Sequence, residues 1–259
     1  GIPETHQRST PGKLIVDALL DFTETGYEAL LREAIRRFRF ADFSELTGNE
    51  GECIWRHDVD MSPHRAVRLA EIEREAGVRA HYFIMFGSRF YNPFELGVTQ
   101  VLKRLSSMGH GIGLHFDPSA LPFPNDSACL QEALLKQADM LSFVLEASVD
   151  SFSLHNPTAA QAVGLGTETF GNLLNVSAPA FVNSFSYCSD SNGIWRHRRL
   201  IDVVRDSSVR RLYALTHPEW WVPLSMRPRE RIQRCIDGRA ASAGREYDED
   251  LLRFGRPNP

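Results

Sequence analysis

Apolar and polar residues follow two patterns that alternate along most of the chain. Short apolar runs predict buried strands, and stretches with an apolar residue every three or four positions predict amphipathic helices. Strands are predicted around 53–55 and at 80–86, 111–116, 151–155, 181–187 and 212–215, and helices around 31–38, 66–76, 93–108, 130–145 and 227–236. Residues 159–176 fit neither pattern well. Because strand and helix alternate, we predict an α/β fold with a mainly parallel sheet or barrel.

Chain length favours one domain. The chain has 259 residues, and a (β/α) barrel of about 250 residues is an ordinary single domain. We find no internal repeat, low-complexity tract or linker that would divide it. Residues 1–12 lack the apolar core of a signal peptide and are predicted to be disordered or derived from an expression vector, with a single domain over 13–259. A signal peptide removed before this start remains an alternative.

Charge and cysteine usage exclude several classes of protein. The net charge of -4 and the absence of a basic run with interleaved aromatics argue against a nucleic-acid partner. No apolar stretch approaches the roughly 20 residues that span a bilayer. The four cysteines are scattered without a CxxC pair, which favours reduced thiols and therefore a cytoplasmic protein.

Two carboxylates mark the end of the first long apolar run. Asp58 and Asp60 stand two positions apart on a predicted strand, so their side chains point to the same face. Ser62 and Pro63 then open a helical pattern. Two like charges held this close require a proton, a cation or a basic side chain between them. A helix cap next to a surface acid is the plain alternative.

Histidines occupy three further strand ends, at His115, His155 and His217, with Asp117 close to the first. A single histidine at a strand end more often makes a structural hydrogen bond than binds a ligand. The carboxyl ends of parallel strands meet on one face, however, so these side chains are expected to converge there. Neutral imidazoles and carboxylates together suit a divalent metal such as zinc.

The same residues make the chain similar to a known family. It resembles the polysaccharide deacetylase (NodB-homology) family of metal-dependent amide hydrolases in three segments, at 56–60, 109–115 and 215–217, with the family's order and spacing over 54–221. The resemblance implies a distorted (β/α) barrel, which in this family often has seven strands, and one divalent metal ion. That ion would be held by one aspartate and two histidines.

Roles for four residues follow from the resemblance. It implies that Asp58 is the general base and Asp60 a metal ligand, with His115 as the first histidine ligand and His217 as the general acid. The chemistry agrees with this division, because a metal lowers the pKa of bound water from 15.7 to about 7 and a carboxylate can then take its proton. A departing amine needs a proton from an acid.

The sequence departs from the family pattern at two places. The second histidine ligand is expected four residues after His115, where Ser119 stands, and a hydroxyl is a poor zinc ligand. His155 is our candidate for the third ligand and Asp117 the second choice. The segment 152–157 also lacks the arginine that orients the base in the family. We expect Arg56 or Arg196 to supply that charge.

Several residues are candidates for contact with a substrate. They are Arg56, Asp117, Asn156, Trp195, Arg196, Trp220 and Trp221. The two adjacent tryptophans would form an apolar platform for a sugar ring, or else belong to the core. Trp195 and Arg196 lie in a polar, turn-rich segment that is either a substrate loop or a plain connection. The remaining histidines, including His57 and His110, are expected in loop or helix-surface hydrogen bonds.

These observations predict an enzyme. We expect a metal-dependent hydrolase that removes an acetyl or formyl group from the nitrogen of an amino sugar or sugar nucleotide, in surface polysaccharide or lipopolysaccharide biosynthesis. Its partner would be a small molecule or glycan, and the sequence leaves the oligomeric state open. One alternative is a non-catalytic carbohydrate-binding descendant, favoured if Ser119 abolished metal binding. Another is a hydrolase of cyclic imides or ureides.

Overall fold

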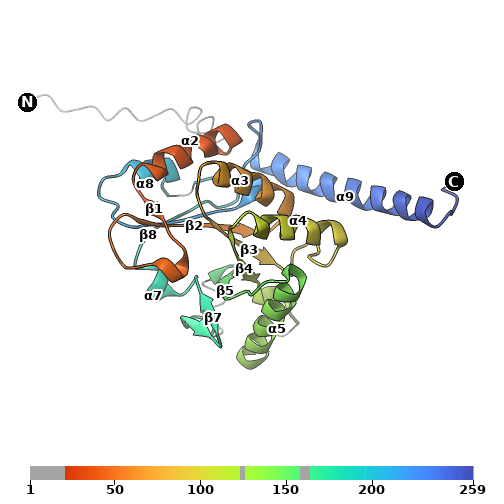
Figure 1. Ribbon diagram of the computed structural model, residues 1–259, viewed down its shortest axis with the longest axis horizontal. Helices are drawn as coiled ribbons and strands as arrows, with labels where there is room; N and C mark the ends of the chain where they lie inside the picture. Colours follow the sequence, from red (N-terminus) through yellow and green to blue (C-terminus); the bar gives the residue numbers. More distant parts are fainter. Residues whose placement is uncertain (1–20, 123–125, 158–163, 196, 259) are drawn as a thin grey trace, which may run out of the picture.

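A curved sheet of mostly parallel strands runs through the protein, with helices along its outer side (Figure 1). The computed structural model describes residues 21–122, 126–157, 164–195 and 197–258. Residues 1–12 and Arg196, both subjects of predictions, lie outside the described residues. The strands are β1 (Arg39–Phe40), β2 (Glu52–Val59), β3 (His81–Met85), β4 (Gly111–Phe116), β5 (Ser151–Leu154), β6 (Thr169–Phe170), β7 (Leu173–Asn175), β8 (Ser186–Ser189) and β9 (Leu212–Thr216).

Helices follow most of the strands. The α-helices are α2 (Glu24–Ile35), α3 (Pro63–Glu75), α4 (Leu96–Ser107), α5 (Ser127–Leu145), α7 (Pro179–Val182), α8 (Leu200–Arg205) and α9 (Pro228–Arg253), and the short 3-10 helices are η1 (Phe43–Glu45), η2 (Pro118–Ala120) and η3 (Pro218–Trp220). Helix α3 begins as its sequence predicts: the Ser62 side chain accepts from the N–H of Arg65, and Pro63 occupies the first turn.

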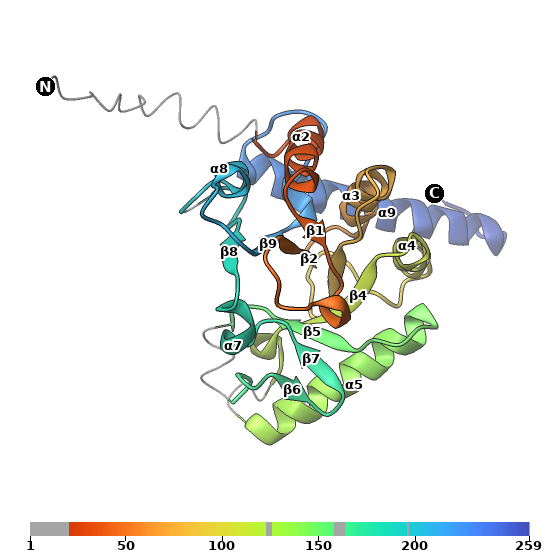
Figure 2. The ribbon, with the colours of Figure 1, turned by 60° about the vertical axis from the view of Figure 1, so that its left-hand side comes forward.

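The strand order is β6-β7-β5-β4-β3-β2-β9-β8, and β1 pairs with β2 beside this path. All neighbours are parallel except β6 and β7. Seven parallel strands, from β7 to β8, therefore form an arc, and Figure 2 shows α2, α3, α4 and α5 along its outer side. No pairing joins β7 to β8 within the described residues, so the barrel is open there. The predicted distorted (β/α) barrel is confirmed in this open form.

Strand β2 has a different environment on each face. All eight of its residues are buried, as expected for a strand covered on both sides. Trp55 and His57 point outward, where they contact Tyr27 of α2. Arg56 and Asp58 alternate with them and point to the inner side, where they contact each other. Because alternate residues of β2 point to opposite faces, the polar groups that stabilise the fold lie on the outer face and those of the candidate site lie on the inner face.

Two predicted elements were wrong in extent. The expected strand at 181–187 is a short helix, α7, followed by β8 from Ser186. Pro179 fixes the first turn of that helix, and Phe181 and Phe185 pack against Tyr213. The helix expected at 227–236 continues to Arg253, because Gly238 and Gly244 stay in the helix and the backbone first reaches positive φ at Gly255.

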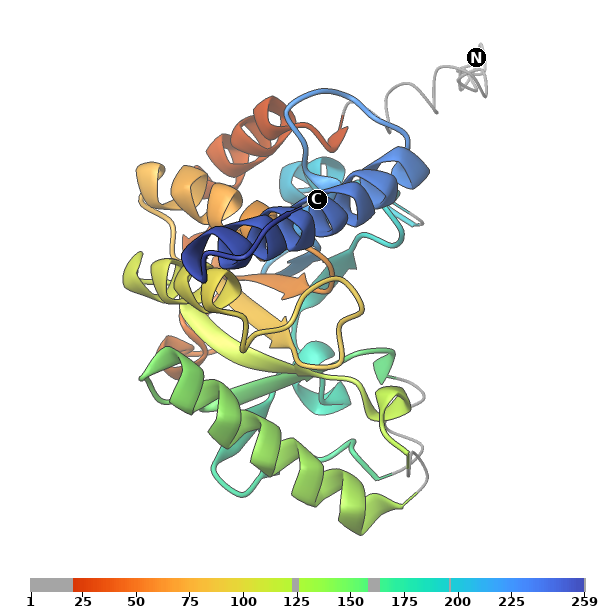
Figure 3. The same ribbon diagram turned by 90° about the vertical axis from the view of Figure 1, so that its right-hand side faces the viewer.

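Helix α9 crosses the molecule beside α3 and then extends away from the sheet (Figures 1 and 3). Arg231 is the only one of its residues that is buried. The four cysteines are free thiols. Among the described residues, no helix is both long and apolar enough to cross a membrane.

Candidate active site

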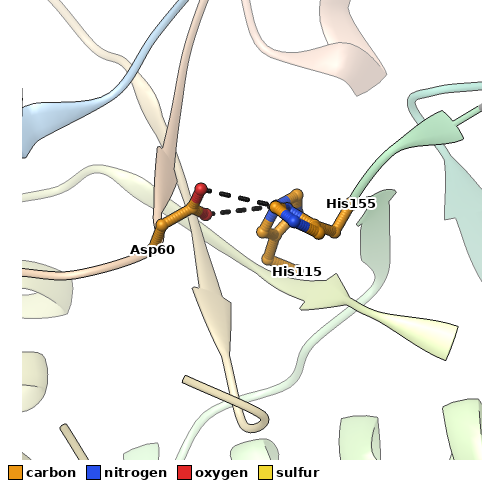
Figure 4. Close-up of side chains that lie close together, drawn as sticks. All are labelled: Asp60, His115 and His155. Atoms are coloured by element: carbon orange, nitrogen blue, oxygen red, sulfur yellow. Dashed lines mark hydrogen bonds and ion pairs between the residues drawn. The ribbon is translucent and has the colours of Figure 1, made fainter. Parts of the chain in front are cut away.

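Three predicted metal ligands meet at the carboxyl ends of three parallel strands, β2, β4 and β5. Asp60 follows β2, His115 lies in β4 and His155 follows β5, and one donor atom from each lies within 4.8 Å of the others. Figure 4 shows the three side chains converging. His115 Nε2 is 3.3 Å from Asp60 Oδ1, and His155 Nδ1 is 3.3 Å from His115 Nε2 and 3.8 Å from Asp60 Oδ2.

This group fits a divalent metal. Asp60 Oδ1 is buried without a hydrogen-bond partner, and two imidazoles with one carboxylate are a common zinc donor set that leaves a fourth position open. Burial raises the pKa of the Asp60 carboxyl, but the close contact and charge of His115 outweigh burial and hold that pKa below its ordinary range. The carboxylate is therefore ionised and able to act as a ligand.

Ser119, which stands where the resembling family has its second histidine, makes structural hydrogen bonds in this chain. Ser119 is exposed on η2, where its hydroxyl and backbone N–H donate to Asp117 Oδ1 over 2.7 and 2.9 Å. Asp117 thus caps η2, and it does not belong to the group formed by Asp60 and the two histidines. Of the two residues proposed as the third ligand, the structure brings His155 to the group.

Asp58, the predicted base, is held by an arginine. Arg56 donates from Nε to Oδ1 over 2.8 Å and from Nη2 to Oδ2 over 2.6 Å. Burial raises the pKa of Asp58, whereas the charges of Arg56 and His115 lower it by more, so the carboxyl stays ionised. Arg56 supplies the orienting charge that the segment 152–157 lacks. Because its side chain is only 3% exposed and also donates to Tyr213, its predicted contact with substrate is replaced by this positioning role.

Ser153 links the base to the metal group, and the sequence did not single it out. The Nδ1–H of His115 donates to Ser153 Oγ over 2.6 Å, and Ser153 Oγ donates to Asp58 Oδ1 over 3.3 Å. A proton on Nδ1 leaves His115 Nε2 free to bind a metal. Ser153 lies opposite His115 in the β4–β5 register. It also stands two residues before His155, on the same strand face, which is the signal that could have identified it.

His217, the predicted acid, is held by a second residue that sequence analysis missed. Asp190 accepts from His217 Nδ1 in a short hydrogen bond and from the His217 backbone N–H over 3.0 Å, and it accepts from the Thr216 hydroxyl over 2.7 Å. Burial lowers the pKa of His217, but the adjacent Asp190 raises it well above the ordinary value. Its Nε2 is 3.9 Å from Asp60 Oδ2. A protonated Nε2 therefore faces the metal group.

The tryptophan platform was a wrong prediction. Trp220 and Trp221 are 3% and 1% exposed, and Trp221 packs against Phe22 and Tyr27 in the core. Trp195 stacks on Phe22 with ring centroids 4.9 Å apart. Buried aromatic side chains of this size contribute strongly to the core. Asn156 is exposed with a φ of 50° directly after His155, and its contact with substrate stays a prediction.

Comparison with known proteins gives likenesses in structure only. No protein-family model and no curated protein matches the sequence. The deacetylase PplD of Streptococcus pyogenes, solved with acetate, is 13% identical over 57% of this chain and 77% of its own, with a TM-score of 0.38. A family 4 carbohydrate esterase from Bacillus anthracis is 14% identical over 98% of this chain and 92% of its own, with a TM-score of 0.39.

A third similar structure is described as a pseudoenzyme. This member of carbohydrate esterase family 4 from Bacillus anthracis is 11% identical over 66% of this chain and 70% of its own, with a TM-score of 0.36. Because all three TM-scores are below 0.5, we base the functional conclusion on the residues of this chain.

Proposed function

We propose that the protein is a metal-dependent hydrolase that removes an acetyl or formyl group from the nitrogen of an amino sugar or sugar nucleotide. One observation carries this proposal: the donor atoms of Asp60, His115 and His155 lie close together, and beside them are Asp58, which is held by Arg56, and His217, which is held by Asp190. Hydrolysis of an amide needs both a base for water and an acid for the amine.

A metal would contribute Lewis-acid chemistry at this site. When bound by Asp60, His115 and His155, a divalent ion such as zinc lowers the pKa of water and stabilises negative charge on the acyl oxygen. Asp58 then accepts the proton of the attacking water, while Arg56 keeps its carboxylate ionised and oriented.

The leaving amine receives its proton from the predicted acid, His217. His217 donates a proton from Nε2, because its Nδ1 is engaged with Asp190. Asp190 keeps the imidazole charged until that transfer. Base and acid are thus held by separate partners, so each can keep its own protonation state.

The biological setting is part of the same proposal. We infer a role in surface polysaccharide or lipopolysaccharide biosynthesis from the resemblance of the sequence to polysaccharide deacetylases. The four free cysteines support a cytoplasmic location.

The alternative function is non-catalytic carbohydrate binding. Ser119, where the resembling family has a ligand, favours it. Asp58 and His217, each held by a charged neighbour, favour the enzyme, because a binding protein needs neither a base nor an acid. A cyclic imide or ureide hydrolase would use much the same groups and differs only in substrate.

A combined metal and substrate assay tests the proposal. The purified chain is analysed for metal content and then incubated with N-acetylated and N-formylated amino sugars, their nucleotide forms and a cyclic ureide, while acetate, formate or ring opening is followed. We expect about one zinc per chain and release of acetate or formate that a chelator abolishes. Glycan binding without turnover by the zinc-loaded protein would establish the non-catalytic alternative instead. Ring opening alone would establish the third function.

A further inference from the structure

The second half of helix α9 has almost no packing within the described part of the chain. The helix runs from Pro228 to Arg253 with only Arg231 buried, and its second half extends beyond the sheet (Figures 1 and 2). Its interior contains Gly238 and Gly244, each costing about 1 kcal/mol relative to alanine. Because helices in proteins are stabilised mainly by packing of one face, α9 calls for a partner surface.

The charges of α9 are distributed unevenly along its length. Residues 227–239 contain five arginines and two acids, whereas residues 240–253 contain two arginines and four acids. The acids of the second half are Glu246, Asp248, Glu249 and Asp250. This order opposes the helix dipole, which favours acids at the N-terminus and bases at the C-terminus. An antiparallel neighbour with the same sequence would place acids beside arginines at both ends.

One exposed face of α9 carries a continuous apolar and small-residue seam. Its members follow at intervals of three or four residues and are Ile236, Ala240, Ala243, Tyr247 and Leu251. Ile232, one turn before them, is partly buried against the core. Such spacing keeps side chains on one face of a helix. Ile236 is 41% exposed and Tyr247 is 63% exposed. Arg239, outside this seam, turns to the body and pairs with Glu95, so the seam remains available.

We propose that the α9 seam is the dimer interface of this protein, with a second copy of the chain as its occupant. The two helices lie antiparallel about a two-fold axis beside Ala241 and Ser242. In that register Ile236 lies opposite Tyr247 of the partner subunit, and Ala240 lies opposite Ala243 of the partner subunit. The small residues at the centre let the helices approach, and the larger apolar pairs close both ends. The interface uses the same patch on both copies, as two-fold symmetry requires.

Sedimentation velocity over a wide concentration range tests this interface in the full chain. We expect a reversible dimer, and Tyr247→Asp should weaken it about 100-fold or more, because a charge would enter the apolar seam. The matched control is Leu252→Asp, since Leu252 lies on the same helix, is 80% exposed and stands outside the seam. That variant should dimerise like the natural chain. Equal loss in both variants would overturn the proposal, as would a natural chain that stays monomeric throughout.

A charge exchange tests the antiparallel orientation. Arg229 of one copy lies within about one helical turn of Asp250 of the partner subunit in the proposed register. Arg229→Glu and Asp250→Arg should each weaken the dimer, and the double variant should recover it. Failure of the double variant to recover, with helix content unchanged by circular dichroism, would overturn the pairing. Binding of a monomeric natural chain to anionic phosphatidylglycerol vesicles would instead assign the seam to a membrane surface.

Discussion

At the residue scale, Asp58 is the group whose chemistry depends most on its neighbours. Asp58→Asn keeps the size of the side chain and removes its basicity, so we expect metal content to persist while turnover falls by about two to four orders of magnitude. Metal analysis and steady-state kinetics on the same preparation check this. Near-normal turnover in Asp58→Asn would show that the carboxylate serves only the structure.

Asp190 determines how far up the pH scale His217 keeps the proton that it donates. Its charge raises the pKa of His217, so His217 stays protonated to higher pH than an ordinary histidine. Asp190→Asn removes that charge, and the pKa of His217 should fall. The alkaline limb of the pH–rate profile for an amide substrate should therefore move to lower pH, while the acid limb, set by Asp58, stays in place.

An activated ester provides the control for Asp190→Asn. Its leaving group needs no proton, so its alkaline limb should not depend on His217. An unchanged amide profile, or an equal shift for ester and amide, would mean that Asp190 acts on the fold rather than on the acid.

The residues of the candidate site and the arginine that holds Asp58 were predictable from the sequence, but two further partners were not. Asp60, His115 and His155 were placed together because parallel strand ends share one face, and the structure brings them together; metal binding by them stays a prediction. Ser153 and Asp190 were missed, because their contacts depend on strand register and on a distant loop. The burial of Trp221 could not be predicted either, because an aromatic residue after a strand end is compatible with a substrate platform and with the core.

At the element scale, one carboxylate connects four elements on the outer side of β2. Glu73 of α3 accepts from the Tyr82 hydroxyl of β3 and from His57 Nε2 of β2, each over 2.6 Å, and from the Tyr27 hydroxyl of α2. It is completely buried. His57 and His110, which also lies close to this carboxylate, were wrongly expected near the surface.

We expect Glu73→Ala to lower the free energy of unfolding by about 3–5 kcal/mol, because it leaves buried donors without an acceptor. Burial raises the pKa of Glu73, but the charge of His57 and its hydrogen bonds lower it below the ordinary value. This stabilisation is therefore present above the ordinary carboxyl pKa and is lost as pH falls through the lowered one.

Urea denaturation at neutral and acid pH measures the effect of Glu73→Ala. Glu75→Ala is the matched control, because Glu75 lies on the same helix and is exposed, and it should change stability by less than about 0.5 kcal/mol. A cost of Glu73→Ala that is equally small would show that the cluster is dispensable.

Most elements were predictable because both faces of the central strands are buried, which produces apolar runs such as that in β2. Prediction weakened after His155, where β6 and β7 have only two and three residues. It also stopped short along α9, because Gly238 and Gly244 are weak helix formers and only small alanines continue the apolar spacing between Ile236 and Tyr247.

At the scale of the whole molecule, the candidate metal site connects three strands. Zinc should therefore bind the folded chain and not the unfolded one, and at 100 times its dissociation constant it should add about 2.7 kcal/mol of stability. We expect zinc to raise the melting temperature of the natural chain and of Ser119→Ala, and to have little effect on His155→Ala. Scanning calorimetry with a zinc titration measures this.

The Ser119→Ala variant makes the zinc test specific. If zinc stabilises His155→Ala as much as the natural chain, the ion sits elsewhere. If Ser119→Ala loses the effect, the family's usual position still contributes a ligand through its hydroxyl.

Neither the open side of the barrel between β7 and β8 nor the projecting α9 could be predicted from sequence, because both depend on how distant segments meet.

Because His155 follows a strand of its own, the three donor residues of the candidate site come from separate segments. Two ligands four residues apart tie the metal to one local turn, and any insertion there disrupts it. In this chain no two members of the group share a loop, since α4 separates Asp60 from His115 and α5 separates His115 from His155. The loops around the site can therefore lengthen or shorten while the donor atoms stay in place. A lineage with this arrangement is free to acquire new specificities.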